Sequence, residues 1–199
     1  MTGRRGFTLL ELAIALALFA VLGYGLALAA RAGGGAGGTV SRVTSESGAL
    51  RSVTRRLSNE LSATRDAAIA VAVLPDGNHE LTFQVPIDDG GTPAWGVYDT
   101  SLGVDPTAWN RPDWSFRYTV REVPSGAGAV ERRLVRQVLD DGGVVQKEDV
   151  ELVGLEVGTA NPPGFRVAQA GDLWELSVSI AADGQHGGRR VVLHVDPKN

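Results

Sequence analysis

A single carboxylate lies within an apolar stretch close to the N-terminus. From residue 7 to residue 30 the sequence reads FTLLELAIALALFAVLGYGLALAA, and Glu11 is the one charged residue in it. A charged group in such a segment costs about 2.5–3.5 kcal/mol on membrane-insertion scales, so it usually marks a function or a buried partner. Glu11 therefore predicts an electrostatic contact that forms when apolar helices pack beside one another.

The other residues that could support catalysis or bind a metal form no recognisable site in the sequence. The three histidines, His79, His186 and His194, have no second ligand nearby at a metal-like spacing, and the chain has no cysteine. No Gly-x-Ser-x-Gly motif, phosphate-binding loop or dinucleotide fingerprint occurs. We therefore expect a protein that is not an enzyme and that uses no metal or other cofactor.

Two Asp-Asp-Gly-Gly runs, at residues 88–91 and 140–143, are the exception to consider for calcium. Their carboxylates are suitable ligands for this ion, but neither run has the ligand spacing of a known calcium loop. Asp-Gly is also among the commonest sequences for a tight hairpin turn. The runs are interpreted as turns, with a calcium site as the alternative.

Three aromatic residues, Trp95, Tyr98 and Trp109, lie in a predicted loop over residues 87–112. Exposed aromatic side chains could stack on sugars or dock another protein, which would make this loop the partner-specific surface. Alternatively, the rings fold back and cover a modest core. The sequence favours the second interpretation and leaves the first open.

The elements that position these residues begin with a transmembrane helix, which we predict over residues 7–32. A membrane span needs about 20 apolar residues. Because Arg4 and Arg5 precede the span, we expect the N-terminus in the cytoplasm and the remainder of this single-pass protein outside the inner membrane. An ordinary secretory signal peptide, cut after Ala27-Leu28-Ala29 to leave Ala30 first, is the alternative, but it gives Glu11 no role.

A glycine-rich joint over residues 33–38 follows, and then a predicted amphipathic helix over residues 39–66. The residues of its inward face recur at spacings of three and four: Val40, Val43, Ser47, Leu50, Thr54, Leu57 and Leu61. Arginines on the other face are interrupted by acidic residues, as is typical of a solvated surface. With a net charge of −4, the chain is also an unsuitable partner for nucleic acid.

The period of the apolar pattern changes to two from about residue 67, and we predict antiparallel β structure over residues 67–199. Residues 69–73 and 81–85 alternate around a Pro-Asp-Gly-Asn turn, which indicates a hairpin. Residues 114–120 and 174–180 alternate as well, and a last hairpin returns over residues 191–195 after a turn at 183–188. Gly154 interrupts the pattern and predicts a bulge. The fold class expected is α+β.

The N-terminal residues Arg5-Gly6-Phe7-Thr8-Leu9-Leu10-Glu11 resemble the signal of type IV prepilins and type II secretion pseudopilins. The resemblance implies that a prepilin peptidase removes residues 1–6 by cutting between Gly6 and Phe7, and that Phe7 is then N-methylated. It also implies that Glu11 serves assembly with other pilins or pseudopilins. The expected filament subunit has a long N-terminal helix packed on an antiparallel sheet.

The layout beyond the N-terminus is similar to that of the larger minor subunits, including the J-type pseudopilin of type II secretion and W-like minor pilins. We expect a structural minor pseudopilin that enters the inner membrane, exposes its β domain to the periplasm and joins a filament for protein secretion. One alternative is a minor pilin of a surface type IV pilus that serves adhesion, motility or DNA uptake. Another is an exported carbohydrate-binding β module with an ordinary signal peptide.

Overall fold

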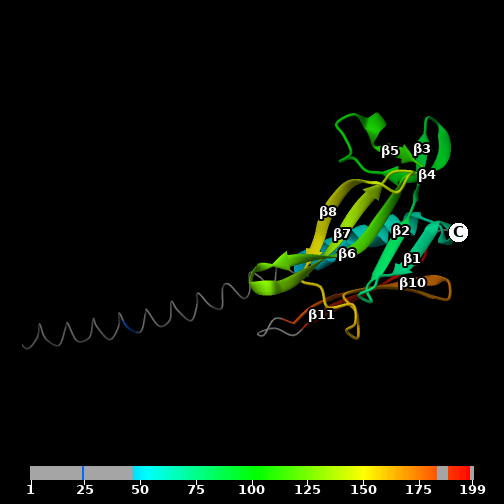
Figure 1. The fold of residues 1–199 in the computed structure, drawn as a ribbon. Coiled ribbons are helices and arrows are strands. Elements are labelled where there is room, and N and C mark those ends of the chain that lie inside the picture. Colours follow the sequence, from blue (N-terminus) through cyan, green and yellow to red (C-terminus); the bar gives the residue numbers. More distant parts are fainter. Residues whose placement is uncertain (1–23, 25–46, 183–187, 198–199) are drawn as a thin grey trace, which may run out of the picture. The chain divides into compact units, whose positions relative to one another are not determined.

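The computed structural model describes residues 24, 47–182 and 188–197 (Figure 1). The chain divides into two units, Met1–Gly48 and Ala49–Asn199, and almost all described residues belong to the second. The predicted leader, joint and transmembrane segment lie outside the described residues, apart from the helical residue Tyr24. Within the described part of the chain, no helix combines the length and the apolar character that crossing a membrane requires.

The described part of the amphipathic helix extends over residues 47–63. Leu50, Val53, Leu57 and Leu61 recur every three or four residues and are almost fully buried, as the 3.6-residue period of a helix requires. The helix ends at Ala63, and the N–H of the following Thr64 donates to the Leu61 carbonyl oxygen at 3.0 Å. A short 3-10 turn, η1 (Asp66–Ala68), then leads into the first strand.

The largest sheet has five antiparallel strands in the order β1-β2-β6-β7-β8 (Figure 1). Its members are β1 (Ile69–Val73), β2 (His79–Phe83), β6 (Ser115–Ser125), β7 (Ala129–Leu139) and β8 (Val145–Val153). β6 and β7 form a long hairpin that is closed by η3 (Gly126–Gly128). Strands β3 to β5 lie between β2 and β6 in the sequence, so the sheet is not a simple meander.

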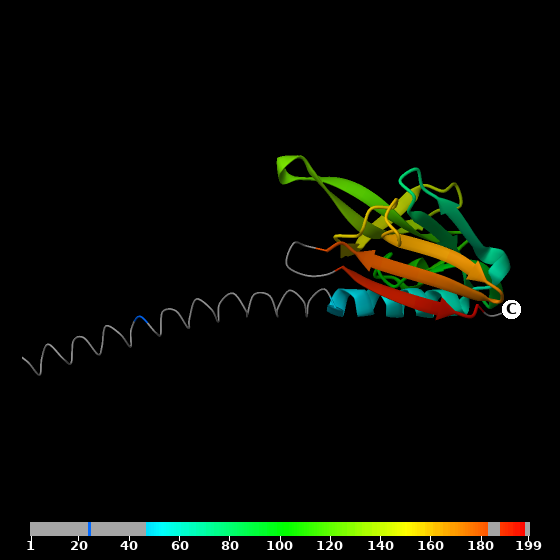
Figure 2. The same cartoon turned by 90° about the horizontal axis from the view of Figure 1, so that it is seen from below.

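Two smaller antiparallel sheets complete the described fold. One has the order β11-β10-β9 and consists of β9 (Phe165–Ala170), β10 (Leu173–Ile180) and β11 (Arg189–Val195). The other has the order β3-β4-β5 and consists of β3 (Val85–Asp89), β4 (Thr92–Tyr98) and β5 (Asn110–Pro112), with η2 (Pro106–Ala108) before β5. Figure 2 shows β11 running close to the helix.

The core lies where the helix, the five-stranded sheet and the β9–β11 sheet meet. Its central rings are Phe83, Phe116 and Tyr118, with Phe83 5.7 Å from Phe116 and 6.1 Å from Tyr118 between ring centroids. The two sheets are joined at β2 and β9 through side chains. The Asn78 Oδ1 accepts a hydrogen bond from the Phe165 N–H at 2.9 Å, and the His79 Nδ1 accepts one from the Val167 N–H at 3.3 Å.

Several sequence predictions are confirmed. The described residues form antiparallel sheets with one α-helix, an α+β arrangement. The β1–β2 and β10–β11 hairpins pair as expected, and β6 includes all of the alternating segment 114–120 except Trp114. The turn predicted at residues 183–188 is described only at Gly188.

The prediction of a loop over residues 87–112 is wrong, because half of this segment belongs to the strands of the β3–β4–β5 sheet. Gly90 and Gly91 both have positive φ angles, 62° and 92°, and close the β3–β4 hairpin. Gly96 interrupts the apolar alternation of β4, but the pairing of β4 with β5 requires a glycine at this position. A Cβ there would lie 2.1 Å from the Arg111 carbonyl oxygen on β5, so only glycine permits this approach.

The bulge predicted at Gly154 is also misplaced. β8 ends at Val153, and Gly154 follows it with a φ angle of 75°. The register shift occurs earlier: Leu134 pairs with Leu152 whereas Val135 pairs with Val150, so Glu151 is the extra residue. Gly154 thus supplies a conformation that favours glycine where the strand ends.

Candidate functional site

The residues of the N-terminal signal, Gly6, Phe7 and Glu11, lie outside the described residues. Their proposed cleavage, methylation and assembly roles therefore stay predictions. The described part of the chain does place the three aromatic residues that were predicted to form a partner surface. It also shows a polar cleft that the sequence did not predict.

The aromatic residues do not form one cluster. Trp95 lies under the Arg65 guanidinium, whose Cζ is 4.6 Å from the ring centroid. Trp109 donates its Nε1–H to the Gly103 carbonyl oxygen at 2.8 Å and meets the Tyr98 ring edge-on at 6.4 Å. The two tryptophans are half-buried, whereas Tyr98 is 51% exposed. A partner surface in this region would therefore centre on Tyr98.

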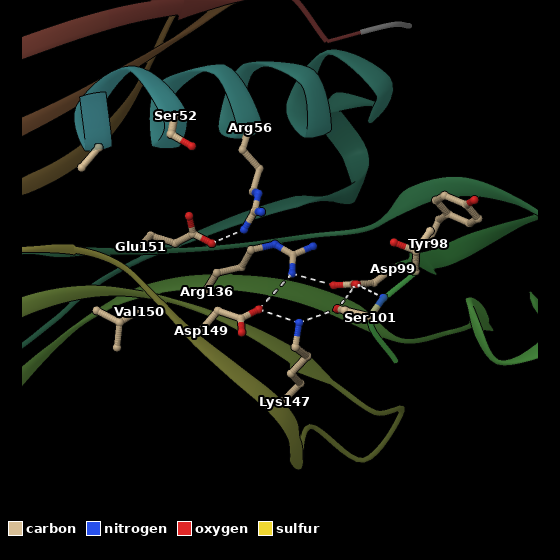
Figure 3. Close-up of a pocket in the computed structure, with 12 residues that line it drawn as sticks. Ser52, Arg56, Tyr98, Asp99, Ser101, Arg136, Lys147, Asp149, Val150 and Glu151 are labelled. Carbon is tan, nitrogen blue, oxygen red and sulfur yellow. Dashed lines mark hydrogen bonds and ion pairs between the residues drawn. The ribbon is translucent and has the colours of Figure 1, made fainter. Parts of the chain in front are cut away.

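The polar cleft has a volume of about 670 Å³ and lies between the helix and strand β8 (Figure 3). The first described turns of the helix form one wall, β8 and Arg136 of β7 form the floor, and residues 98–101 after β4 form one end. Four segments of the chain thus converge on one polar space. In Figure 3 the Arg136 side chain points toward Asp99, and Arg56 reaches down from the helix toward Glu151.

Arg136 is the centre of the hydrogen bonding in this cleft. Its side chain is only 5% exposed. Its Nε and Nη2 donate to one Glu60 oxygen at 3.1 and 2.8 Å, and its Nη1 donates to Asp99 at 2.7 Å. Its Cζ also lies 4.1 Å from the Phe116 ring centroid. The Tyr118 hydroxyl donates to the second Glu60 oxygen at 2.8 Å, so the carboxylate from the helix is held by two strands.

The charges of this cluster shift one another's pKa values. Burial opposes ionisation of Asp99, but hydrogen bonds from Ser101 and Arg136 together outweigh it and lower the pKa to about 2. Burial raises the pKa of Glu60, although Arg136 and Tyr118 act in the opposite direction. Burial also opposes the charge of Arg136, but Glu60, Tyr118 and Asp99 together outweigh it and raise the arginine pKa. Burial and the Glu60 charge raise the pKa of Tyr118 well above its ordinary value.

The outer part of the cleft contains further ion pairs. Lys147 lies 2.7 Å from Asp149 and also donates to the Ser101 hydroxyl oxygen. Arg56 pairs with Glu151 of β8. Three residues at intervals of four bond to the sheets: Arg56 and Glu60 on the helix, and Thr64 directly after it. The Thr64 hydroxyl donates to the Gln84 carbonyl oxygen. They form a polar stripe beside the apolar one, as i, i+4 spacing on a helix predicts.

The cleft is built to join elements. Each charged side chain named above is paired with another side chain in the cleft or its floor. Among residues 24, 47–182 and 188–197, no group of three or more histidine, aspartate or glutamate side chains is placed to hold a metal ion. Asp88 accepts from the Gly91 N–H and Asp140 from the Val144 N–H, so these carboxylates cap their own turns. Hairpin turns, the interpretation favoured for the two Asp-Asp-Gly-Gly runs, are what form there.

The Arg136 cluster was not predicted from the sequence, although one signal was present. Alternate residues of a strand share a face, so Leu134, Arg136 and Val138 of β7 lie on one face. Leu134 and Val138 are buried apolar residues, and an apolar residue is therefore expected at position 136, where the chain has an arginine. A buried cation requires a paired anion. No local feature, however, identifies Glu60 and Asp99 as the partners, because they are 76 and 37 residues away.

Comparison with known proteins identifies the N-terminal segment. Residues 1–23 match the family described as the prokaryotic N-terminal methylation motif. The match supports a type IV pilin-like prepilin signal. Proteins that carry such a signal are processed by a prepilin peptidase and assemble with other pilins. No curated protein and no solved structure matches the chain.

Proposed function

We propose that this chain is a structural minor pseudopilin, processed after Gly6 and assembled through its N-terminal helix into a type II secretion pseudopilus. The observation that carries the proposal is the methylation motif at residues 1–23, within which Gly6, Phe7 and Glu11 have the spacing of a prepilin signal. Phe7 would be N-methylated, and the β domain would lie on the periplasmic side of the inner membrane.

The placement of Glu11 gives the assembly step a physical basis. Cleavage after Gly6 makes the Phe7 amine a positive charge at the membrane edge, close to Glu11 in the sequence. In a bundle of packed helices, Glu11 of one subunit would neutralise the amine of its neighbour. Opposite charges about 4 Å apart attract by roughly 4 kcal/mol at an effective dielectric of 20. This is comparable with the cost of placing the carboxylate in the membrane, so the pair would set the axial register of the subunits.

The described domain is consistent with a structural role. Its polar cleft contains mutually paired charges, and two of the pairs, Arg56–Glu151 and Glu60–Arg136, hold the helix to the large sheet. A subunit that joins a filament through its N-terminal helix needs such a connection, because the helix must keep its place on the domain it carries. The exposed ring of Tyr98 and the surface around it remain the proposed contact for a specific partner.

The first test is the mature N-terminus of the full-length chain, expressed with a prepilin peptidase and analysed by mass spectrometry. We expect N-methylated Phe7 as the first residue, and uncut precursor when Gly6→Val obstructs the peptidase. Arg5→Lys is the matched control and should be cut normally. A mature chain that begins at Ala30 would show an ordinary signal peptide and overturn the proposal.

The second test separates processing from assembly. Glu11→Ala should leave cleavage after Gly6 intact but prevent incorporation into filaments, as measured by quantifying the processed chain in sheared and pelleted filaments. Leu10→Ala, which changes the neighbouring apolar residue, should incorporate at close to the normal level. Normal incorporation of the Glu11→Ala chain would refute the assembly role of the carboxylate.

The third test identifies the machine. Proteins that copurify with the chain from gently solubilised membranes should include other pseudopilins and type II secretion components. Recovery of a major pilin with pilus retraction proteins would instead assign the chain to a surface type IV pilus.

A further inference from the structure

The three described sheets leave six edge strands, and one of them differs from the rest. The edges are β1 and β8 of the large sheet, β9 and β11 of the second sheet, and β3 and β5 of the third. An edge strand presents unpaired backbone N–H and C=O groups to any other strand. Natural edges are protected against such pairing by charges, proline, bulges or short length.

Five of the six edges carry such protection. β8 has two register irregularities and contains Lys147 and Asp149. β3 and β5 contain Pro86 and Pro112. The remaining protected edges, β9 and β11, carry arginines: Arg166 on β9, and Arg189 and Arg190 on β11.

β1 is as short as β3, but it has no charge, proline or bulge. Its sequence is Ile-Ala-Val-Ala-Val, without a charge or a proline. All five residues pair with β2 in one continuous antiparallel register, from Ile69 opposite Phe83 to Val73 opposite His79, so no bulge twists the edge away. β1 lies at the margin of the large sheet (Figure 1).

The apolar side chains of β1 are also uncovered. Every residue of the strand after Ile69 is exposed, and the exposed fraction reaches 67% at Val73 and 37% at Val71. Val71 belongs to the inner face of the sheet, because it pairs with Leu81, which pairs with the buried Tyr118. The inner apolar surface therefore continues past the core and ends at an open edge.

We propose that β1 pairs antiparallel with β1 of a second copy of this chain, which extends the large sheet across a two-fold axis. The strand is complementary to itself in this arrangement. With Val71 opposite its own copy, Ile69 faces Val73, Ala70 faces Ala72, and large residues meet large residues on the inner face. Aliphatic cross-strand pairs of this kind stabilise a sheet, and a two-fold axis requires the same patch on both subunits.

A second copy fits β1 better than a charged peptide does. The strand offers no ionic group to select such a peptide. Its alternation of large and small residues is the same when the strand is read in the opposite direction, as antiparallel pairing with a second copy requires. A five-residue edge gives a small contact, so the dimer should exchange and depend on concentration.

The test uses cysteine cross-linking, since the chain has no cysteine of its own. Opposite residues in an antiparallel pair have Cα atoms about 4.5–5.5 Å apart, within the range of a disulfide. The full-length Val71→Cys chain should therefore form a disulfide-linked homodimer in membranes under mild oxidation. Val150→Cys is the matched control, because Val150 is a comparably exposed valine on the protected edge β8, and this chain should remain largely monomeric.

A second variant separates β1 pairing from assembly through the N-terminal stretch. Val71→Lys places a charge on the two-fold axis and should raise the dimer dissociation constant at least tenfold in sedimentation of the full-length chain in mild detergent. Val150→Lys should leave it unchanged. Equal dimerisation of both lysine variants, a Val71→Cys chain that stays monomeric, or its cross-linking to a different protein would each overturn the proposal. Cleavage after Gly6 should be normal in all four variants, so this result is independent of the proposed function.

Discussion

Replacing Arg136 with methionine should destabilise the described domain by about 3–5 kcal/mol at neutral pH, the usual result of removing one partner from a buried ion pair. Arg136→Met keeps much of the aliphatic volume over Phe116 but removes three hydrogen bonds, two to Glu60 and one to Asp99. Glu60 would keep only the bond from Tyr118, and Asp99 those from Ser101. Two buried carboxylates would then lack their cation.

The assay is thermal unfolding of the purified full-length chain in detergent, followed by circular dichroism at several pH values. For a unit of about 150 residues, each kcal/mol corresponds to about 2–4 °C, so the midpoint should fall by about 6–20 °C. Burial already raises the pKa of Glu60 above 4.5. Without Arg136 it should rise further, so the folded variant would bind a proton that the unfolded chain releases. The loss of stability should therefore increase as pH rises above about 4.5.

Two further variants make this reasoning refutable. Arg133→Met on the same strand breaks the exposed pair with Glu131 and should cost at most about 1 kcal/mol. The double change Glu60→Met and Arg136→Met removes this buried pair and leaves Asp99 with its bonds from Ser101. It should recover part of the loss, since apolar replacements of a buried pair are often tolerated. A loss below about 1 kcal/mol for Arg136→Met, or one that does not change with pH, would refute the account.

Three more predictions concern pH and packing. The pKa of Asp99 is about 2 in the folded chain against an ordinary 3.8. The ionised carboxylate therefore contributes fully to stability above pH 3.8, and this contribution is lost as pH falls toward 2. The stability of the Asp99→Asn chain should not show this loss when it is measured in an acid titration. Burial lowers the pKa of His79 below 6.5, and only the neutral ring accepts a hydrogen bond from the Val167 N–H. The free energy of unfolding should therefore decrease as pH falls below 6.5. The His79→Gln chain should show a smaller decrease in denaturant titrations. Gly96→Ala should destabilise the β4–β5 pairing by more than about 1 kcal/mol, measured by denaturant unfolding, whereas Gly126→Ala, which meets no atom within 4 Å, should be nearly neutral.

The sequence allowed the elements with strong local signals to be predicted. The spacing of Leu50, Leu57 and Leu61 indicated the helix, and Pro75-Asp76-Gly77-Asn78 indicated the turn of the first hairpin. These features depend on residues close together in the chain. The α+β class was predicted from the change in the period of the apolar residues, from helical spacing to a period of two, where the strands begin.

Features that depend on distant residues were missed. The β3–β5 sheet was predicted as a loop because Pro93 and Gly96 interrupt the apparent pattern of β4, and the need for Gly96 arises only from the approach of Arg111. The extra residue in β8 is Glu151, whose position depends on its pairing with β7 and cannot be seen in β8 alone. The Arg136 cluster similarly joins a helix, a strand and a segment after β4 that no local pattern connects.

The polar stripe on the helix also has a mechanical consequence. Arg56, Glu60 and Thr64 attach successive turns to three places: to β8, to β6 and β7, and to the residue that follows β2. A force applied along the helix axis would load these attachments in parallel, as in shear, so several must rupture together. A force perpendicular to the axis would break them one after another, as in peeling. The domain should therefore resist tension along its helix much better than tension across it.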